Sequence, residues 1–229
     1  MNDLRDTVWR ALGTVLDPEL DEPITALDFV ASCTVSGGGV ASVHLRLPTF
    51  FCAPNFSFLM VADAYDAVSA VEGVTRASIV LDDHHASTEI NGGVAAHAGF
   101  VQTFAGEADA ELEELRQYFL EKAVLAGQDR VARPLADTGV GPDELARLTL
   151  GAAPASPDLD RLRRRRAALG LPAGDDAALL IHGDGSAVTA AQVPMHLRRA
   201  RLTRLGMESN GDLCKSFLKT RYADTAGIG

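Results

Sequence analysis

A cysteine at a predicted bend is the residue of this chain best suited to chemistry. Cys52 lies in Leu47-Pro48-Thr49-Phe50-Phe51-Cys52-Ala53-Pro54, directly after a predicted strand and before a helix that Pro54 can begin. A helix N-terminus stabilises a thiolate, and an accessible thiolate can hold iron, a cluster fragment or a partner's metal. The alternative interpretation is that Cys52 is a small buried hydrophobic residue, as free cysteines usually are.

An acidic turn, Asp17-Pro18-Glu19-Leu20, lies upstream of this cysteine. Asp17 and Glu19 could be iron ligands or proton acceptors, and together with Thr49 they are the side chains expected to support a site at Cys52. The alternative is a structural turn that ends the first helix, in which Asp17 accepts hydrogen bonds from backbone N–H groups.

The other metal-capable side chains are weaker candidates. Cys214 falls in a helical pattern and could be a second ligand or a redox partner, whereas Cys33 lies in a strand pattern and is interpreted as structural. His84 and His85 are adjacent at the end of a predicted strand, where neighbours point to opposite faces and rarely bind one ion. Three cysteines without CxxC spacing do not indicate a disulfide framework, and a reducing cytosol fits them best.

The elements that must position Cys52 follow from the spacing of apolar residues. The pattern predicts a helix, two strands around a glycine turn, a second helix and a third strand, over about 3–15, 29–35, 40–47, 54–73 and 74–81. The fold class is therefore α+β, with an N-terminal α-β-β-α-β two-layer sandwich over residues 1–82 and a mainly helical C-terminal region.

After residue 82 the sequence changes character. Residues 83–108 are rich in small residues, glycine and histidine, and are predicted to be a loop or linker. Residues 109–229 are predicted to be mainly helical, with helices near 109–127, 143–150, 158–169, 191–205 and 210–222 and a short strand at 179–181.

Four segments of the N-terminal third resemble the MIP18-like family, also called the domain-of-unknown-function 59 family, whose members include SufT-like and PaaD-like iron–sulfur assembly factors. The segments are Val15-Leu16-Asp17-Pro18-Glu19-Leu20, Ile24-Thr25-Ala26-Leu27-Asp28-Phe29-Val30, Leu45-Arg46-Leu47-Pro48-Thr49-Phe50-Phe51-Cys52-Ala53-Pro54 and Glu72-Gly73-Val74-Thr75-Arg76-Ala77. The resemblance implies the α-β-β-α-β fold, a role in assembling or inserting iron–sulfur or related metal centres, and Cys52 as the functional thiol.

The chain departs from the family pattern around that thiol. The family commonly has glycine where Asp28 stands, cysteine directly followed by proline, and a smaller Pro-Gly bend where this chain has Phe50-Phe51. These departures suggest a specialised branch. The roughly 140 C-terminal residues have no counterpart in the minimal family domain. The resemblance associates family members extended in this way with gene clusters for bacterial diiron hydroxylases such as propane monooxygenases, which would make the protein a dedicated maturation factor.

Two basic runs stand out against a net charge of -10. The first is Arg161, Arg163, Arg164, Arg165 and Arg166, and the second is Arg198, Arg199, Arg201 and Arg204. Such runs are usually solvated helix faces, and the competing hypothesis is that the first run is a docking surface for an acidic partner. The negative charge of the whole chain, and the lack of an aromatic platform or recognition motif, disfavour nucleic acid.

We therefore predict a non-enzymatic maturation factor that assists iron–sulfur cluster or iron-centre assembly on a client metalloprotein through Cys52. Iron or a cluster would be bound transiently, and the helical region 109–229 would recognise the client. The alternative is a scaffold or regulatory protein that uses the same fold without metal. No nucleophile elbow, phosphate loop or dinucleotide fingerprint appears.

The expected setting is the cytoplasm, since we find neither a secretory signal nor a run of apolar residues long enough to span a membrane. A homodimer that brings two Cys52 thiolates together would supply further ligands, although nothing in the sequence requires one.

Overall fold

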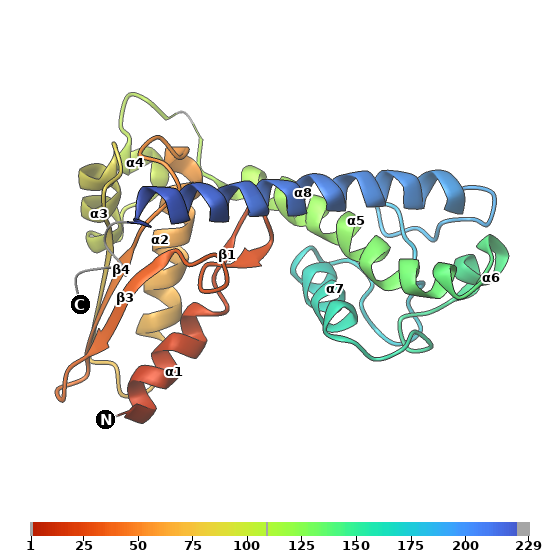
Figure 1. Cartoon of the computed structure of the whole chain (residues 1–229), viewed down its shortest axis with the longest axis horizontal. Coiled ribbons are helices and arrows are strands. Elements are labelled where there is room, and N and C mark those ends of the chain that lie inside the picture. Colours follow the sequence, from red (N-terminus) through yellow and green to blue (C-terminus); the bar gives the residue numbers. More distant parts are fainter. Residues whose placement is uncertain (1, 109, 224–229) are drawn as a thin grey trace. The chain divides into compact units, whose positions relative to one another are not determined.

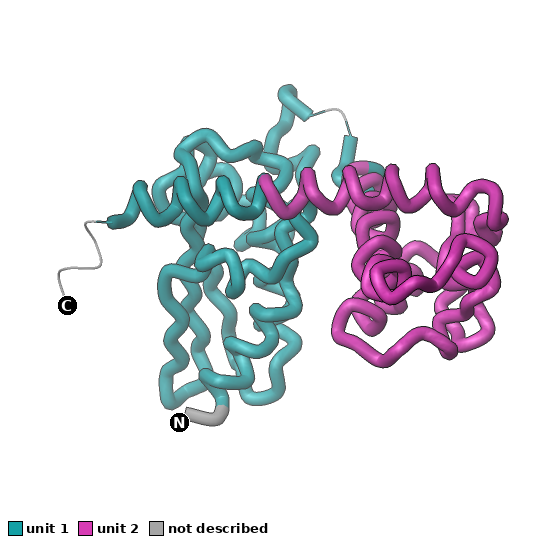
Figure 2. Tube along the Cα trace, turned by 45° about the vertical axis from the view of Figure 1, so that its right-hand side comes forward, with its two compact units in different colours: residues 1–114, 210–229 teal, residues 115–209 magenta. Residues whose placement is uncertain are grey.

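The structure is a computed structural model that describes residues 2–108 and 110–223. The chain divides into two compact units: unit 1 comprises residues 1–114 and 210–229, and unit 2 comprises residues 115–209 (Figure 2). Each unit has its own hydrophobic core.

Unit 1 contains the α-β-β-α-β arrangement that the sequence predicts (Figure 1). Its elements are α1 (Asn2–Leu12), β1 (Leu16–Asp17), β2 (Glu22–Pro23), β3 (Val30–Val35), β4 (Val40–Leu45), α2 (Pro54–Ser69), β5 (Arg76–Leu81), α3 (Ser87–Ala95), α4 (Phe100–Thr103) and the last part of α8 (Val193–Arg221). The predicted α+β class is confirmed.

The main sheet has the strand order β3-β4-β5. β3 and β4 form an antiparallel hairpin, while β5 returns through α2 to pair with β4 in parallel. Val43 lies opposite Cys33 on one side and Ile79 on the other, and all three are buried. Alternate residues of β4 therefore point into one core, as period-two patterning requires.

The helices complete this core on one face of the sheet. Val8 and Leu12 of α1, and Val61, Ala64 and Val68 of α2, are completely buried with the inward side chains of the strands. Apolar burial of this kind supplies most of the free energy that stabilises a domain. The two-layer sandwich thereby fixes where β4 ends and where α2 begins.

Residues 83–108, predicted to be a linker, instead contain the helices α3 and α4. Ile90 and Val94 of α3 are buried in the unit 1 core, and Phe100 of α4 packs edge-on against Phe58 of α2. The prediction failed because glycines and small polar residues surround these few apolar side chains, so no helical period was visible in the sequence.

Unit 2 is mainly helical. It contains α5 (Glu113–Asp137) from Leu115 onward, α6 (Pro142–Arg147), α7 (Pro157–Ala168) and the first part of α8. The strand predicted at 179–181 is reduced to isolated bridges, in which Ala178 pairs with Thr149 and Ile181 pairs with Ala187. The two helices predicted over 191–205 and 210–222 are one continuous helix, α8.

The division of the chain therefore differs from the predicted boundaries at residues 82 and 109. The last described part of α8 contributes Leu218, which is 3% exposed, to the core of unit 1. Among the residues that the structure describes, none of the helices is long and apolar enough to cross a membrane.

Candidate functional site

The loop that carries Cys52 joins the end of β4 to the start of α2. Leu47 and Pro48 are buried and hold the loop on the core, whereas the next residues turn outward. Pro54 occupies the first turn of α2, where a missing N–H costs no helical hydrogen bond. Cys52 is half-buried just before the helix, so its thiol is partly open to solvent.

Thr49 approaches the thiol from within this loop. Its hydroxyl oxygen lies 3.4 Å from Sγ of Cys52, and the Cys52 N–H donates to the Thr49 carbonyl oxygen at 3.5 Å. The structure thus places the Thr49 hydroxyl beside the thiol, and the supporting role of Thr49 stays a prediction.

His84 holds the backbone of Cys52 from the segment after β5. Its Nε2 donates to the carbonyl oxygen of Cys52 at 2.7 Å, while its Nδ1 accepts from the N–H of Ala86 at 3.1 Å. Both contacts require the neutral ring protonated on Nε2. Burial is the main reason that the pKa of His84 lies below its usual value, and the nearby His85 and Arg221 act in the same direction.

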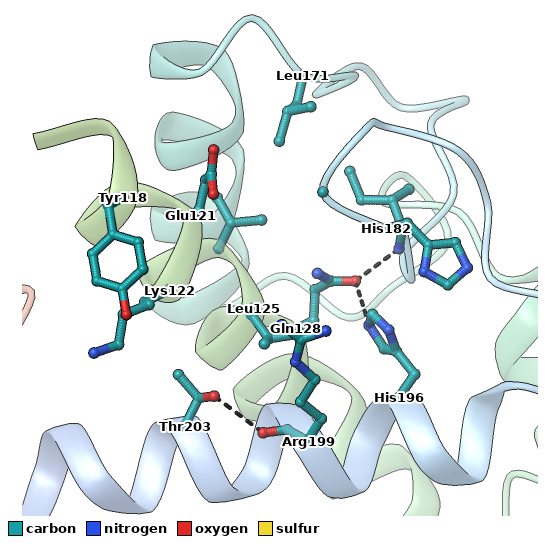
Figure 3. A pocket seen from close by; sticks show the side chains of 13 residues that line it. Tyr118, Glu121, Lys122, Leu125, Gln128, Leu171, His182, His196, Arg199 and Thr203 are labelled. Carbon is teal, nitrogen blue, oxygen red and sulfur yellow. Dashed lines mark hydrogen bonds between the residues drawn. The ribbon is translucent and has the colours of Figure 1, made fainter. Parts of the chain in front are cut away.

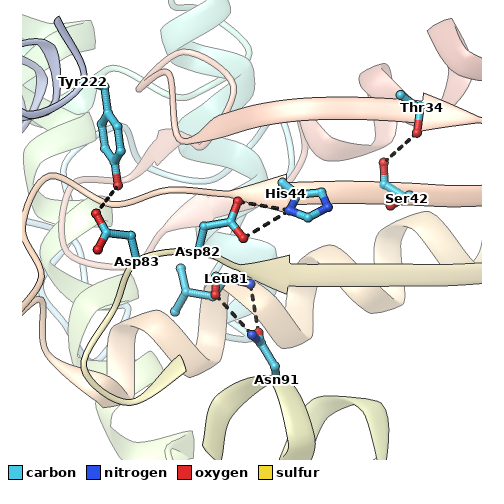
Figure 4. A network of polar contacts seen from close by, with 8 residues as sticks. All are labelled: Thr34, Ser42, His44, Leu81, Asp82, Asp83, Asn91 and Tyr222. Atoms are coloured by element: carbon cyan, nitrogen blue, oxygen red, sulfur yellow. Dashed lines mark hydrogen bonds and ion pairs between the residues drawn. The ribbon is translucent and has the colours of Figure 1, made fainter. Parts of the chain in front are cut away.

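The segment that carries His84 is itself anchored (Figure 4). Asn91 of α3 bonds both the N–H and the C=O of Leu81, at 2.8 and 3.1 Å, and Asp82 pairs with His44 at 3.0 Å. Sequence reasoning weighed His84 only as a metal ligand. The structure gives it a positioning role, which no local sequence pattern reveals.

A cluster of exposed rings lies beside the thiol. Phe51 is 78% exposed and contacts Phe50 edge-on, with ring centroids 5.0 Å apart. His85 lies 5.7 Å from the ring of Phe51, and its Nδ1 is 3.0 Å from the Phe50 carbonyl oxygen. A large apolar side chain in this position costs free energy in water unless another surface covers it.

The acidic turn is built around Asp17, which is 8% exposed. Its Oδ1 accepts from the N–H groups of Glu19 and Leu20, both at 2.9 Å. Burial raises the pKa of Asp17 to about 6, although the two hydrogen bonds act in the opposite direction. The structural interpretation of the turn is therefore correct for Asp17, which leaves one carboxylate oxygen outside these two bonds.

Cys214 lies on α8 close to this turn and to Cys52. Burial raises the pKa of the Cys214 thiol to about 11, and the negative charges of Asp17, Cys52 and Glu19 add to the effect in that order. Cys214 and Cys52 both pack against the hydrophobic core of unit 1. Glu19 also accepts from Asn210 at 3.4 Å, and Lys215 pairs with Glu22 at 2.8 Å, so α8 is held against the acidic turn.

Residues 5–79 match the family model described as "Iron-sulfur cluster assembly protein". The N-terminal third of this chain is therefore similar to that iron–sulfur cluster assembly family. The expected resemblance and the expected fold are thereby confirmed. No curated protein and no solved structure matches the chain.

Unit 1 also contains the last part of α8, which the family match does not include. Arg221 donates to the carbonyl oxygen of Leu47 at 3.0 Å and pairs with Asp83 at 2.6 Å. Tyr222 donates to the same aspartate at 3.3 Å (Figure 4). The end of α8 thus holds both segments that shape the Cys52 loop.

The donor set around Cys52 suits iron, because thiolates and carboxylates both bind it. Within the described part of the chain, however, no three His, Cys, Asp or Glu side chains converge tightly enough to hold an ion. Cys33 is buried in β3, as the structural interpretation expects, and burial raises the pKa of its thiol. Cys52 and Cys214 are the two free thiols of unit 1 that are only partly buried.

The first basic run does not form one exposed surface. Arg166, predicted to bind a partner, is completely buried and donates to the backbone carbonyls of Ala178 and Leu179. Arg163 pairs with Asp175 at 2.7 Å and donates to the Ala173 carbonyl. Arg164 is exposed and Arg161 and Arg165 are half-buried, so a docking role remains a proposal for these three.

Proposed function

We propose that this protein assists the assembly of an iron–sulfur cluster or iron centre on a client protein, and that Cys52 contacts the cargo. The family match to residues 5–79 supports the general role. The residue assignment is supported by contacts in unit 1: Asn210 and Lys215 of α8 bind Glu19 and Glu22, and Cys52 and Cys214 pack against the same core.

The chemistry of this group favours a cation. The negative charges that keep a proton on Cys214 would attract iron, and a thiol must lose its proton to become a ligand. Binding at Cys214 would therefore release a proton and tighten as the pH rises. Two thiols and two carboxylates that do not converge on one point form an incomplete ligand set. Such a set suits iron that is bound briefly, with the client protein supplying the remaining ligands.

The exposed rings beside Cys52 would provide the contact with the client. Phe51 and Phe50 offer an apolar surface next to the thiol, and aromatic side chains often anchor protein interfaces. Arg161, Arg164 and Arg165 of unit 2 would add a basic surface for an acidic client. We infer a non-catalytic accessory role in which the protein presents cargo and the client completes the ligand set.

A bacterial diiron monooxygenase is the client class that we propose. A diiron carboxylate centre uses oxygen and imidazole ligands, so Cys52 would be a transient carrier or contact for iron rather than a permanent ligand. Co-expression of such a hydroxylase with wild-type protein should give a metallated client. Co-expression with Cys52→Ala should lower the iron content of the client severalfold.

Anaerobic reconstitution with Fe²⁺ and sulfide tests the metal role directly. We expect wild type to retain iron after desalting, Cys52→Ala to lose nearly all of it, and Cys214→Ala to bind about tenfold more weakly. Cys33→Ala is the matched control, because Cys33 is buried on the far side of β3 from solvent and should not affect retention. Absence of iron in wild type, with client binding unchanged by Cys52→Ser, would favour the scaffold alternative.

A further inference from the structure

Unit 2 contains a cavity of about 310 Å³ that the iron–sulfur assembly role does not use (Figure 3). It lies between α5, α8 and the segments around residues 171 and 181–183. Cavities of this size hold small organic ligands. Its lining residues all belong to unit 2, so the cavity is independent of Cys52.

Basic side chains surround this cavity. Lys122 of α5 and Arg199 of α8 line it together with His182 and His196, whereas Glu121 is the one acidic residue among the described lining residues. In Figure 3 the Lys122 side chain extends beside Tyr118, and Arg199 lies near Gln128. Unit 2 as a whole has 14 Lys and Arg against 11 Asp and Glu, although the complete chain has a net charge of -10. The site therefore favours an anion.

A buried cation adds to the positive field. Arg166 is 0% exposed, and among the described residues its bonding partners are backbone carbonyls, those of Pro172, Ala178 and Leu179. Within the described part of the chain, its Nε has no hydrogen-bond partner. A buried charge without a counter-ion is costly, and an anion in the neighbouring cavity would offset part of that cost.

The polar groups of the cavity are ordered by hydrogen bonds. Oε1 of Gln128 accepts from the Ile181 N–H at 2.7 Å and from Nε2 of His196 at 3.2 Å. The rings of His196 and His182 meet edge-on, with centroids 5.7 Å apart. Burial lowers the pKa of His196 to about 4, and the charges of His182, Arg199 and Arg166 act in the same direction. His182 and Arg199 line the cavity together with His196.

Apolar side chains complete the lining. They are Val124, Leu125, Leu171 and Ile181, with the ring of Tyr118 beside Lys122. A purely inorganic anion would leave these walls in contact with water. A ligand with an acidic head and a short apolar body would use both the cations and the walls.

We propose that this cavity binds a small organic anion, a carboxylate or phosphate monoester with a short hydrocarbon chain, through Arg199 and Lys122. Arg199 is exposed and lines the cavity, and no acidic side chain among the described residues pairs with its guanidinium group. Lys122 lies over the rings of Tyr118 and Phe119, which hold its ammonium group at 5.4 and 5.0 Å from their centroids. The two cations come from different helices, α5 and α8, that both line the cavity.

Isothermal titration calorimetry of the full-length protein tests this site with four probes. Hexanoate and hexyl phosphate carry the proposed chemistry with different head groups, inorganic phosphate lacks the chain, and hexylamine reverses the charge. We expect one of the two hexyl anions to bind at a single site, at least about tenfold more tightly than inorganic phosphate, with no binding of hexylamine. Whichever of hexanoate and hexyl phosphate binds more tightly identifies the head group that the site prefers.

Variants then locate the site. Arg199→Gln and Lys122→Gln should each weaken binding about tenfold or more, because each removes a charge-assisted hydrogen bond. Arg201→Gln is the matched control, since Arg201 is exposed on the same helix but does not line the cavity. The bound anion should also raise the pKa of His196 in an NMR titration. Failure of both hexyl anions to bind, or binding that neither cavity variant weakens, would overturn the proposal.

Discussion

The imidazole of His84 donates a hydrogen bond to the carbonyl oxygen of Cys52 at 2.7 Å. This contact joins the segment after β5 to the loop before α2, across 32 positions of sequence. The ring is 3% exposed, and both of its nitrogens are engaged. The orientation of the Cys52 peptide therefore depends on a residue outside the loop.

Replacing His84 should destabilise unit 1 and loosen the Cys52 loop. His84→Ala leaves a buried carbonyl and the N–H of Ala86 without partners and creates a cavity, so we expect a loss of about 2–4 kcal/mol in unfolding free energy. The alkylation rate of Cys52 should rise severalfold. Urea denaturation and iodoacetamide kinetics measure the two effects. His97→Asn, at an exposed position with positive φ, should change stability by less than about 0.5 kcal/mol.

The Asp17→Asn variant should be more stable than the wild-type protein at neutral pH. Asn keeps an acceptor for the N–H groups of Glu19 and Leu20 and removes a buried charge. Burial raises the pKa of Asp17 from 3.8 to about 6. The stabilising contribution of the protonated carboxyl group is therefore fully present below pH 3.8 and is lost as the pH rises through 6.

The advantage of Asp17→Asn should therefore grow between pH 4 and 6 and reach on the order of 1–2 kcal/mol at pH 7. Asp17→Ala should instead cost about 1–2 kcal/mol, because two N–H groups lose their acceptor. Denaturant midpoints at pH 4, 5, 6 and 7 separate the two variants. A constant difference between Asp17→Asn and wild type over this range would contradict the burial argument.

The three thiols should differ in reactivity. Cys52 is half-buried in a loop and should react first with iodoacetamide at pH 7.5. Cys214 should react at least about tenfold more slowly, because its pKa is raised to about 11 and the thiolate is the nucleophile. Cys33, at 4% exposure, should react only on unfolding. Peptide mass spectrometry after timed quenching gives the order, and faster labelling of Cys214 than of Cys52 would refute it.

The local part of the site could be predicted from the sequence. Alternation in β4, the bend after Leu47 and the proline at the start of α2 are all short-range signals, and together they place Cys52 correctly. A joint role for Cys214 and Cys52 stays a prediction, because 162 positions separate the two residues and no sequence period connects them. Gly211 disfavours a helix, so the sequence predicts a break where α8 is continuous. In the structure Gly211 is buried next to Glu22.

The arginine run shows why composition alone misleads. Five arginines within six positions resemble a solvated face, yet the helical period turns Arg163 and Arg166 toward the segment 172–179. Buried backbone carbonyls in that segment need donors, and a planar guanidinium supplies several at once. Only the path of the following loop, which has no regular pattern, distinguishes such an arginine from its exposed neighbours.

The neutral state of His196 should make unit 2 sensitive to mild acid. Its pKa is about 4 in the folded protein and near 6.5 when unfolded, so its contribution to stability is present above 6.5 and is lost as the pH falls toward 4. Solvent reaches the half-buried ring, which limits the expected loss to about 2 kcal/mol across this window. His196→Gln cannot be protonated and should lose less stability than wild type from pH 7 to 4.5. Parallel curves of unfolding free energy against pH for the two proteins, or an NMR pKa of His196 near 6.5, would contradict this account. Curves that differ in slope, with a smaller loss for His196→Gln, would identify His196 as the acid-sensitive group beside Gln128.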